Sequence, residues 1–182
     1  MFLEPFRGSV AVAGGLLSKG KLRGPHFRKL FPDIYVHASV RITPVVRARA
    51  AALFVDRCGG AAGGFSAAEV QGASCGSWRE PAEVLVTGRV RSHPGLLVRR
   101  GDLTGSGFAD GVRVTSPLGT AWDLARRLDL EEAVVAVDAL GRRRAERPVF
   151  VPYPPGRSPD PDTLALSRLR SPPARGSIRP SC

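Results

Sequence analysis

The chain has 182 residues, of which 43% are hydrophobic and 24% charged, a composition typical of a globular protein. Its apolar runs are far shorter than the roughly 18 residues of a membrane-spanning helix, and its first residues lack the pattern of a signal peptide. Cys58, Cys75 and Cys182 have neither the spacing of a zinc site nor that of a disulfide framework. We therefore expect a cytoplasmic protein without a metal or another cofactor.

The formal net charge of +11 is unevenly distributed along the chain. Residues 1–57 carry ten Lys/Arg and three Asp/Glu, residues 58–141 carry eight and ten, and residues 142–182 carry nine and three. A basic segment joined to a slightly acidic one is typical of a nucleic-acid-binding module attached to a second domain. An Arg-rich composition produced by GC-rich coding is an alternative explanation of the charge.

Two short helices and a hairpin are predicted in the first forty residues. Ser9 is placed to cap one helix over residues 9–13, and Ser18 to cap a second that ends at residue 23. Two aromatic-rich runs then flank Pro32-Asp33, which is turn chemistry. This succession predicts a small winged-helix head.

A longer helix is predicted over residues 44–56, with Pro44 at its first position. Arg47 and Arg49 are expected to point away from the core. The expected apolar face consists of Val46, Ala50, Leu53 and Phe54. This helix is expected to brace the head, which we delimit as residues 1–56.

The middle segment, residues 57–141, predicts an α+β domain. Its glycine-rich start at residues 59–64 is interpreted as a flexible linker, and Ser66 with Glu69 as a capping box that opens a short helix. Three strands are predicted over residues 82–87, 96–100 and 112–115.

Two helices close this segment. Ser116-Pro117 starts the first, and Asp129 caps the second over residues 130–140, which Gly141 is expected to end. The faces expected to be buried are Leu118, Ala121, Trp122 and Ala125 in the first helix, and Ala133, Val134, Val137 and Leu140 in the second.

Residues 142–182 hold nine of the sixteen prolines and nine arginines without any periodicity. This composition predicts a disordered tail. Because a GC-rich frame read one base out encodes such residues, we interpret the tail as frameshifted or truncated relative to a longer ancestor.

Several segments resemble actinobacterial proteins with an AbiEi-like antitoxin domain. The segments similar to the head of that family are residues 6–9, 17–23 and 28–36. Those similar to its second region are residues 66–69, 110–117, 120–127 and 131–140. The resemblance covers residues 6–141.

The resemblance implies a winged-helix head that binds DNA and represses its own operon, followed by an α+β antitoxin domain. It also implies a nucleotidyltransferase-like toxin as partner, as in type IV toxin–antitoxin systems. Many relatives continue into a domain similar to very-short-patch-repair endonucleases. Such a nuclease needs a lysine beside its metal-binding acids, and no lysine follows Gly141.

The candidate nucleic-acid site is a basic cluster in the head. Its members are Lys19, Lys21, Arg23, His26, Arg28 and Lys29. Lys and Arg that converge on one surface bind phosphates. An ordinary solvated face is the alternative. The head contains neither Asn nor Gln, so base readout is not predicted.

No catalytic site is predicted. Asp123 and Asp138 lie on neighbouring helices, but no His, Lys or nucleophile accompanies them, and surface carboxylates paired with arginine are the simpler interpretation. His93 lies in a turn without a partner. We expect a DNA-binding, antitoxin-like regulator that is not an enzyme. The alternatives are a module that binds a toxin without specific DNA binding, and an inactive remnant of a nuclease.

Overall fold

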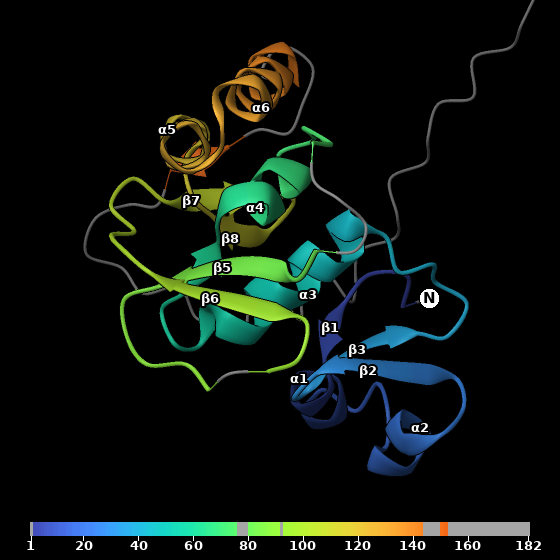
Figure 1. The fold of residues 1–182 in the computed structure, drawn as a ribbon. Helices are drawn as coiled ribbons and strands as arrows, with labels where there is room; N and C mark the ends of the chain where they lie inside the picture. Colours follow the sequence, from blue (N-terminus) through green and yellow to red (C-terminus); the bar gives the residue numbers. More distant parts are fainter. Residues whose placement is uncertain (1, 76–79, 92, 144–149, 153–182) are drawn as a thin grey trace, which may run out of the picture.

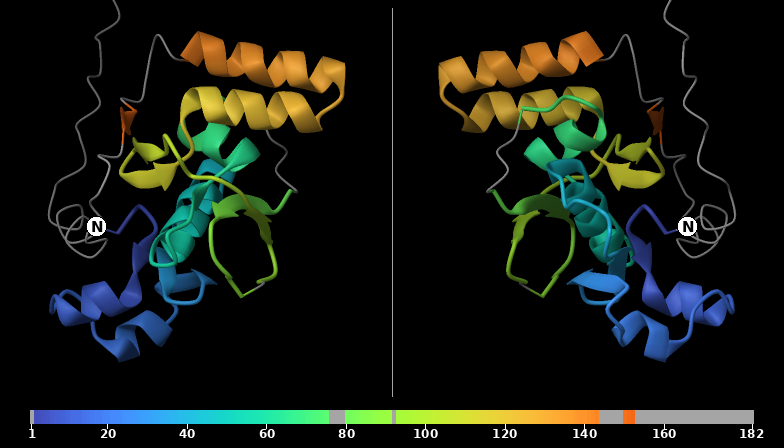
Figure 2. Two further views of the ribbon diagram at one scale, coloured as in Figure 1. Left: turned by 90° about the vertical axis from the view of Figure 1, so that its left-hand side faces the viewer. Right: turned by 90° about the vertical axis from the view of Figure 1, so that its right-hand side faces the viewer.

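The computed structural model describes residues 2–75, 80–91, 93–143 and 150–152, which form a mixed α+β fold (Figure 1). A small antiparallel sheet lies near the N-terminus, and a six-stranded mixed sheet with helices follows. The two further views show the small sheet with its helices at one end of the molecule and the last two helices at the other (Figure 2). The α+β class expected from the sequence is confirmed.

The N-terminal part consists of three strands and two short helices. They are β1 (Phe6–Arg7), α1 (Gly8–Ala13), α2 (Lys19–Arg23), β2 (Phe27–Phe31) and β3 (Ile34–His37). The sheet order is β1-β3-β2, and both pairings are antiparallel. The two helices and the hairpin predicted here are confirmed, with β1 added at the edge.

The start of α1 differs from the sequence expectation. Ser9 lies inside the helix instead of capping it, and the cap comes from the hairpin turn 24 residues away. The carboxylate of Asp33 accepts a hydrogen bond from the Ser9 amide at 2.8 Å, and its carbonyl accepts one from the Gly8 amide at 2.9 Å. Asp33 has a φ of 62°, a left-handed conformation that aspartate tolerates in turns.

A β-bulge lets β2 serve two cores. Phe27 pairs with His37, but the register shifts between Lys29 and Phe31, so that Phe31 pairs with Ile34. Phe27 therefore packs toward α1 and α2, whereas Phe31 packs with Ile34 on the opposite face of the sheet.

Helix α3 (Pro44–Asp56) joins the small sheet to the large one. Its predicted start at Pro44 is confirmed, and the Thr43 hydroxyl caps it by accepting a hydrogen bond from the Val46 amide. The buried face is built mainly of alanines and differs from the face expected, in which Val46, Leu53 and Phe54 are only half-buried. Ala50, Ala51 and Val55 pack with Phe31 and Ile34 on one side and with the large sheet on the other.

The six-stranded sheet runs in the order β6-β5-β4-β8-β7-β9. Its strands are β4 (Ala61–Ala62), β5 (Ala82–Val86), β6 (Leu96–Arg100), β7 (Gly107–Ala109), β8 (Val112–Val114) and β9 (Val151–Pro152). The β5–β6 and β4–β8 pairs are parallel, and the others are antiparallel. The three predicted strands are β5, β6 and β8.

The interpretation of residues 59–64 as a flexible linker is wrong, because Ala61 and Ala62 form β4 inside the sheet. The small residues are required by close packing. A Cβ on Gly60 would lie 2.7 Å from Cγ2 of Val55 and 2.9 Å from Cγ1 of Val86. Strand propensity does not reveal such a segment, because glycine and alanine are depleted in strands.

The capping box predicted for α4 (Gly64–Val70) is also wrong. The N-cap is Gly63, and Ser66 lies inside the helix with its hydroxyl accepting a hydrogen bond from the Glu83 amide at 2.8 Å. Ser66 therefore fixes α4 to β5 instead of starting the helix.

Helices α5 (Pro117–Arg127) and α6 (Leu130–Arg143) form an antiparallel hairpin (Figure 2). Their caps are confirmed: the Ser116 side chain accepts from the Gly119 amide, and Asp129 accepts from the Glu132 amide at 2.9 Å. The expected stop at Gly141 is wrong, since α6 continues to Arg143. The disordered tail was expected to start at residue 142, but β9 pairs with β7. The rest of that tail lies outside the described residues.

Candidate nucleic-acid interface and neighbouring polar sites

Helix α2 presents a basic exposed side. Lys19, Lys21 and Arg23 are exposed, while Leu22 is buried in a cluster with Phe6 and Ala11. The Ser18 hydroxyl caps the helix by accepting a hydrogen bond from the Lys21 amide at 3.2 Å. The apolar anchor thus fixes the helix with its cations toward solvent, an arrangement suited to phosphate contacts.

The register of the hairpin separates the two cations of β2. Lys29 pairs with Tyr35, on the face that α2 covers through Leu22 and Phe27. Arg28 pairs with Val36 on the other face, and its guanidinium donates a hydrogen bond to the Val40 carbonyl. The expected convergence of the whole cluster on one surface is therefore not found, because neighbouring strand residues point to opposite faces.

We call Lys19, Lys21, Arg23 and Lys29 the α2 surface. Among the described residues, none of these four cations has an ion-pair partner. His26 is exposed in the connection between α2 and β2.

Two of the three acidic residues of the head, Glu4 and Asp33, have partners outside the α2 surface. Asp33 caps α1, and Glu4 forms an ion pair with Arg49 at 2.9 Å. Arg49 also contacts Asp110 in the β7–β8 turn, so it ties the head to the large sheet. Arg49 and Arg47 were expected to point away from the core, but both are half-buried, and Arg47 donates to the Glu80 carbonyl at 2.9 Å. Within the described residues, no ion pair joins an α2 cation to a carboxylate, so these cations keep their charge available for a partner.

A second charged group lies where α5 meets the large sheet. Nη2 of Arg127 is 3.0 Å from the buried Glu83 carboxylate and 2.8 Å from the Asp123 carboxylate. Burial lowers the pKa of the Arg127 guanidinium, but its hydrogen bonds to Glu83 and Asp123 outweigh that effect and hold the pKa above its ordinary value. Arg127 therefore stays charged and acts as a structural clamp.

Gly64 makes room for this clamp. Its φ is +51°, and a Cβ there would lie 1.6 Å from Oε2 of Glu83 and 2.6 Å from Nη2 of Arg127. The close approach was not predicted, because nothing in the local sequence indicates that residues 64, 83 and 127 meet.

The two carboxylates considered as an acid/base pair do not meet. Asp123 is paired with Arg127, and Asp138 is paired within α6 with Arg142 at 2.7 Å. His93 packs edge-on against Phe31, with 5.3 Å between ring centroids. In the described part of the chain, no group of three or more His, Cys, Asp or Glu residues is placed to hold a metal ion.

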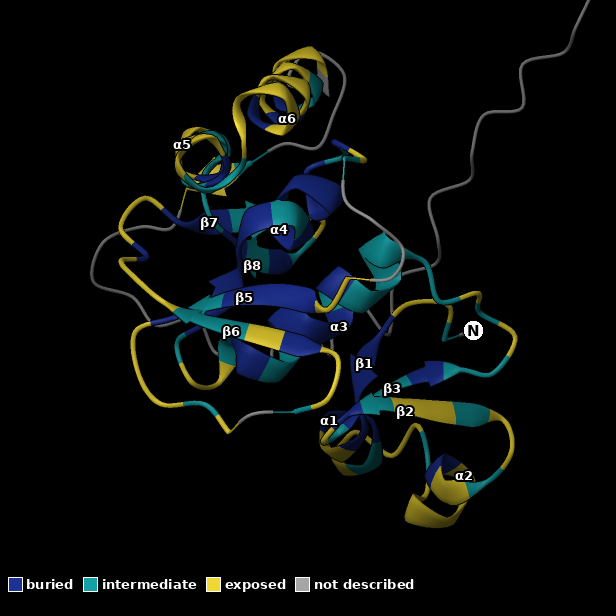
Figure 3. Cartoon of the chain, in the orientation of Figure 1, coloured by how far each residue is buried: buried dark blue, intermediate teal, exposed yellow. Residues whose placement is uncertain are grey.

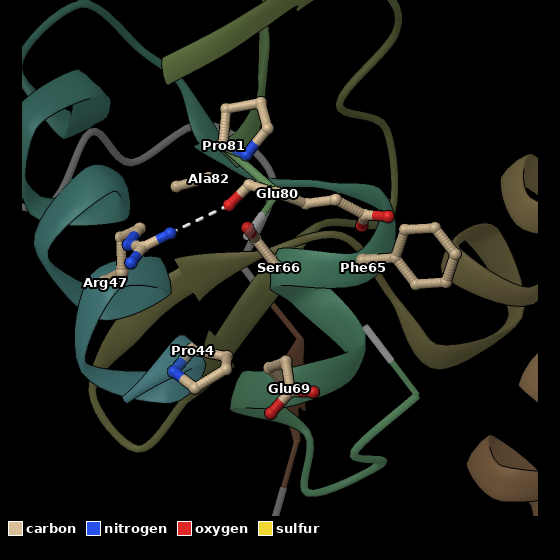
Figure 4. A pocket seen from close by; sticks show the side chains of 8 residues that line it. All are labelled: Pro44, Arg47, Phe65, Ser66, Glu69, Glu80, Pro81 and Ala82. Carbon is tan, nitrogen blue, oxygen red and sulfur yellow. Dashed lines mark hydrogen bonds between the residues drawn. The ribbon is translucent and has the colours of Figure 1, made fainter. Parts of the chain in front are cut away.

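A shallow hollow lies between α3, α4 and the start of β5 (Figure 4). Its polar lining includes Arg47, Ser66, Glu69 and Glu80. The hydrogen bond from Arg47 to the Glu80 carbonyl spans it, and the Ser66 hydroxyl is committed to the Glu83 amide. These contacts stabilise the junction of the elements and present no activated nucleophile.

The two described cysteines differ in environment. Cys58 is exposed, whereas Cys75 is half-buried beside the cluster that contains Leu124 and Leu140. Burial, reinforced by the nearby Glu69 carboxylate, raises the pKa of the Cys75 thiol to about 11. Cys182 lies outside the described residues.

No helix within the described ranges is both long and apolar enough to cross a membrane. Comparison with known proteins adds no relative: no protein-family model, no curated protein and no solved structure matches the chain.

Proposed function

We propose that the chain binds DNA through the α2 surface and acts as an antitoxin-like regulator of its own operon. The observation that carries DNA binding is that Lys19, Lys21, Arg23 and Lys29 of the head are all exposed and that none of them has an ion-pair partner among the described residues. Phosphate neutralisation requires such a group, because each contact releases condensed counterions from the duplex.

The order of elements supports a winged-helix interpretation of the head. The succession β1-α1-α2-β2-β3 places a second short helix directly before a two-stranded hairpin. In helix-turn-helix proteins the second helix enters the major groove. Helix α2 has that position, and its exposed side is the basic one.

The regulatory role rests on the resemblance of residues 6–141 to the AbiEi-like family. An autoregulator must prefer its own upstream DNA, by about 10³-fold or more over unrelated DNA at physiological salt. The four cations of the α2 surface supply phosphate affinity, while base preference has to come from arginine contacts or from DNA shape.

The experiment is a salt-dependent binding titration of the full chain on upstream and unrelated duplexes. Lys19→Glu/Lys21→Glu is expected to weaken binding to both and to lower the slope of log K against log salt by about 2, for two lost phosphate contacts. The matched control is Arg89→Glu/Arg91→Glu, which changes the net charge equally at exposed residues between β5 and β6. Equal losses in both variants would show that only overall charge matters.

The hairpin register gives a sharper test. Lys29→Glu is expected to weaken DNA binding by about tenfold, as loss of one phosphate contact plus one repulsion implies. Arg28→Glu is expected to have a much smaller effect, because Arg28 lies on the opposite face and contacts the Val40 carbonyl. A larger loss for Arg28→Glu would contradict the assignment of the α2 surface.

A further inference from the structure

The α5–α6 hairpin exposes large apolar side chains. Leu118 and Trp122 of α5 are 80% and 66% exposed, and Leu130 and Val134 of α6 are 82% and 60% exposed. Figure 3 shows this hairpin with long exposed stretches at the end of the molecule far from α2. Five residues expected to be buried are exposed: Leu118, Trp122, Ala125, Val134 and Val137. Leu140 is buried as expected, and Leu124 and Ala136 fill the rest of this core. Contiguous apolar surface of this kind marks an interaction site.

The exposed apolar residues of the two helices lie on the same side of the hairpin. The buried seam between the helices contains Ala121 and Leu124 of α5 and Ala136 of α6. Helical geometry places Leu118 and Trp122 next to Ala121, on the side away from α4. The same geometry places Leu130 and Val134 on the corresponding edge of α6, because Ala136 packs toward α4, in one buried cluster with Ala68. The two stripes therefore form one surface.

We call this surface the hairpin face. It consists of Leu118, Trp122 and Ala125 of α5 and Leu130, Val134 and Val137 of α6. Both helices repeat their exposed apolar residues at intervals of four and then three. This spacing is the seam pattern of helices that pack against other helices at a shallow angle. The surface is thus shaped to receive a pair of helices.

The charges beside the hairpin face favour a second copy of the chain. Helix α6 begins with Glu131 and Glu132 and carries Arg142 near its end, and all three side chains are exposed. Arg142 also pairs with Asp138 of its own helix at 2.7 Å, but its guanidinium is 78% exposed and has further donors for a second carboxylate. When two such helices pair antiparallel, Glu131 of each copy lies opposite Arg142 of the other. A twofold axis then brings the exposed apolar residues of each helix against the same residues of the other copy, as an isologous interface requires.

We propose that the chain forms a homodimer in which two α5–α6 hairpins pack through their hairpin faces as a four-helix bundle. This arrangement buries Trp122, the kind of large aromatic residue that dominates interface energies. The proposal is independent of DNA binding, since it rests on residues at the other end of the molecule. The dimer carries two α2 surfaces.

Sedimentation velocity of the full chain over a wide concentration range tests the dimer. The wild type is expected at twice the 19.3 kDa chain mass. Trp122→Lys/Val134→Lys is expected to be monomeric at every concentration, because each copy would bury two charges at the twofold interface. The matched control is Val135→Lys on the same helix, because Val135 is 59% exposed but points away from the hairpin face. It is expected to stay dimeric.

Circular dichroism at the same concentrations checks that each variant is folded. A monomeric wild type, or a dimer that Trp122→Lys/Val134→Lys leaves intact, would overturn the proposal. So would a monomeric wild type that captures a different protein through Trp122, because the occupant would then not be a second copy.

A charge swap tests the antiparallel pairing separately from folding. Arg142→Glu and Glu131→Arg are each expected to weaken the dimer by about threefold to tenfold, as two exposed ion pairs per dimer imply. The double variant is expected to recover most of the wild-type affinity, because it restores opposite charges across the interface. Single variants that weaken the dimer without recovery in the double variant would contradict the proposed geometry.

Discussion

The head and the α5–α6 hairpin use side chains in opposite ways. The head buries large apolar residues such as Phe6, Phe31 and Ile34 and exposes cations on α2. The hairpin buries mainly alanines together with Leu124 and Leu140, and exposes Trp122 and other large apolar side chains. One end of the molecule is therefore suited to a charged partner and the other to an apolar one.

The two ends also differ in how they are attached to the large sheet. Phe31 and Ile34 of the head share an apolar core with α3 and β5. The hairpin seam is lined with small residues, and the ion pairs of Arg127 with Glu83 and Asp123 supplement it. A seam of small residues buries less apolar area per residue. The ion pairs of Arg127 are therefore expected to contribute more to the attachment of the hairpin than any single ion pair contributes to the attachment of the head.

The largest expected effect on stability is at Gly64, and it tests how the hairpin and the head differ in their attachment to the large sheet. Gly64→Ala forces alanine into a left-handed conformation and places its Cβ where the Glu83 carboxylate lies. Strain and the disrupted buried ion pair are together expected to lower the free energy of unfolding by about 3 kcal/mol or more. Urea unfolding followed by circular dichroism measures this difference.

Gly105→Ala is the matched control for Gly64→Ala. Gly105 also has a positive φ, of +73°, but a Cβ there would meet no atom within 4 Å. Only the backbone strain of about 1 to 2 kcal/mol is expected. Equal losses in the two variants would mean that the clamp contributes nothing to stability, and the proposed difference between the two attachments would be wrong.

The sequence predicted those elements whose signals are local. Helix starts at Pro44, Ser116 and Asp129 follow from capping chemistry within four residues. The β5, β6 and β8 strands follow from their apolar and β-branched composition. Strand β7 was not predicted, although the turn residues Asp110-Gly111, which both have positive φ in the β7–β8 hairpin, are a local signal for it.

Elements set by distant contacts were not predicted. Strand β4 consists of two alanines, and its place in the sheet depends on Val55 and Val86 approaching Gly60. The faces of α5 and α6 were assigned from apolar residues at helical spacing, and this failed at Trp122 because Leu124 and alanines of the helices fill the interior side of the seam. The basic cluster was identified by sequence proximity. The alternation of a strand already separates Arg28 from Lys29, but only the pairing with β3 shows that Lys29 is the one on the face covered by α2.

A smaller effect is expected in the head at Asp33. Asp33→Ala removes the carboxylate that caps α1 from across the hairpin and leaves alanine at a positive φ. The expected loss is about 1 to 2 kcal/mol, typical of a missing cap. Asp33→Asn is the control, because asparagine caps helices and tolerates the same backbone conformation.

Hydrogen exchange of the α1 amides locates the effect of Asp33→Ala. Faster exchange is expected for the α1 amides. The exchange rates of the α5 and α6 amides are expected to change no more than the global free energy of unfolding accounts for. Equal acceleration in the head and in the hairpin would contradict the view that the cap acts locally, and would mean that Asp33 stabilises the whole chain.

The last expected effect concerns the reactivity of a cysteine thiol instead of stability. It reports whether the α5–α6 hairpin stays packed against the rest of the protein. Cys75 packs at the edge of the seam formed with α5 and α6, and its thiol has a pKa of about 11. Because the thiolate is the reactive form, alkylation of Cys75 is expected to be slow near neutral pH and to accelerate only as the pH approaches 11. Exposed Cys58 is the internal reference, in a chain whose Cys182 is replaced by serine. Mass spectrometry of the labelled peptides gives both rates.

In Gly64→Ala, the alkylation rate of Cys75 relative to that of Cys58 is expected to rise, because loss of the Arg127 clamp exposes the seam. An unchanged ratio would show that the hairpin stays in place without the clamp, and that its alanine seam alone holds it as firmly as the aromatic core holds the head.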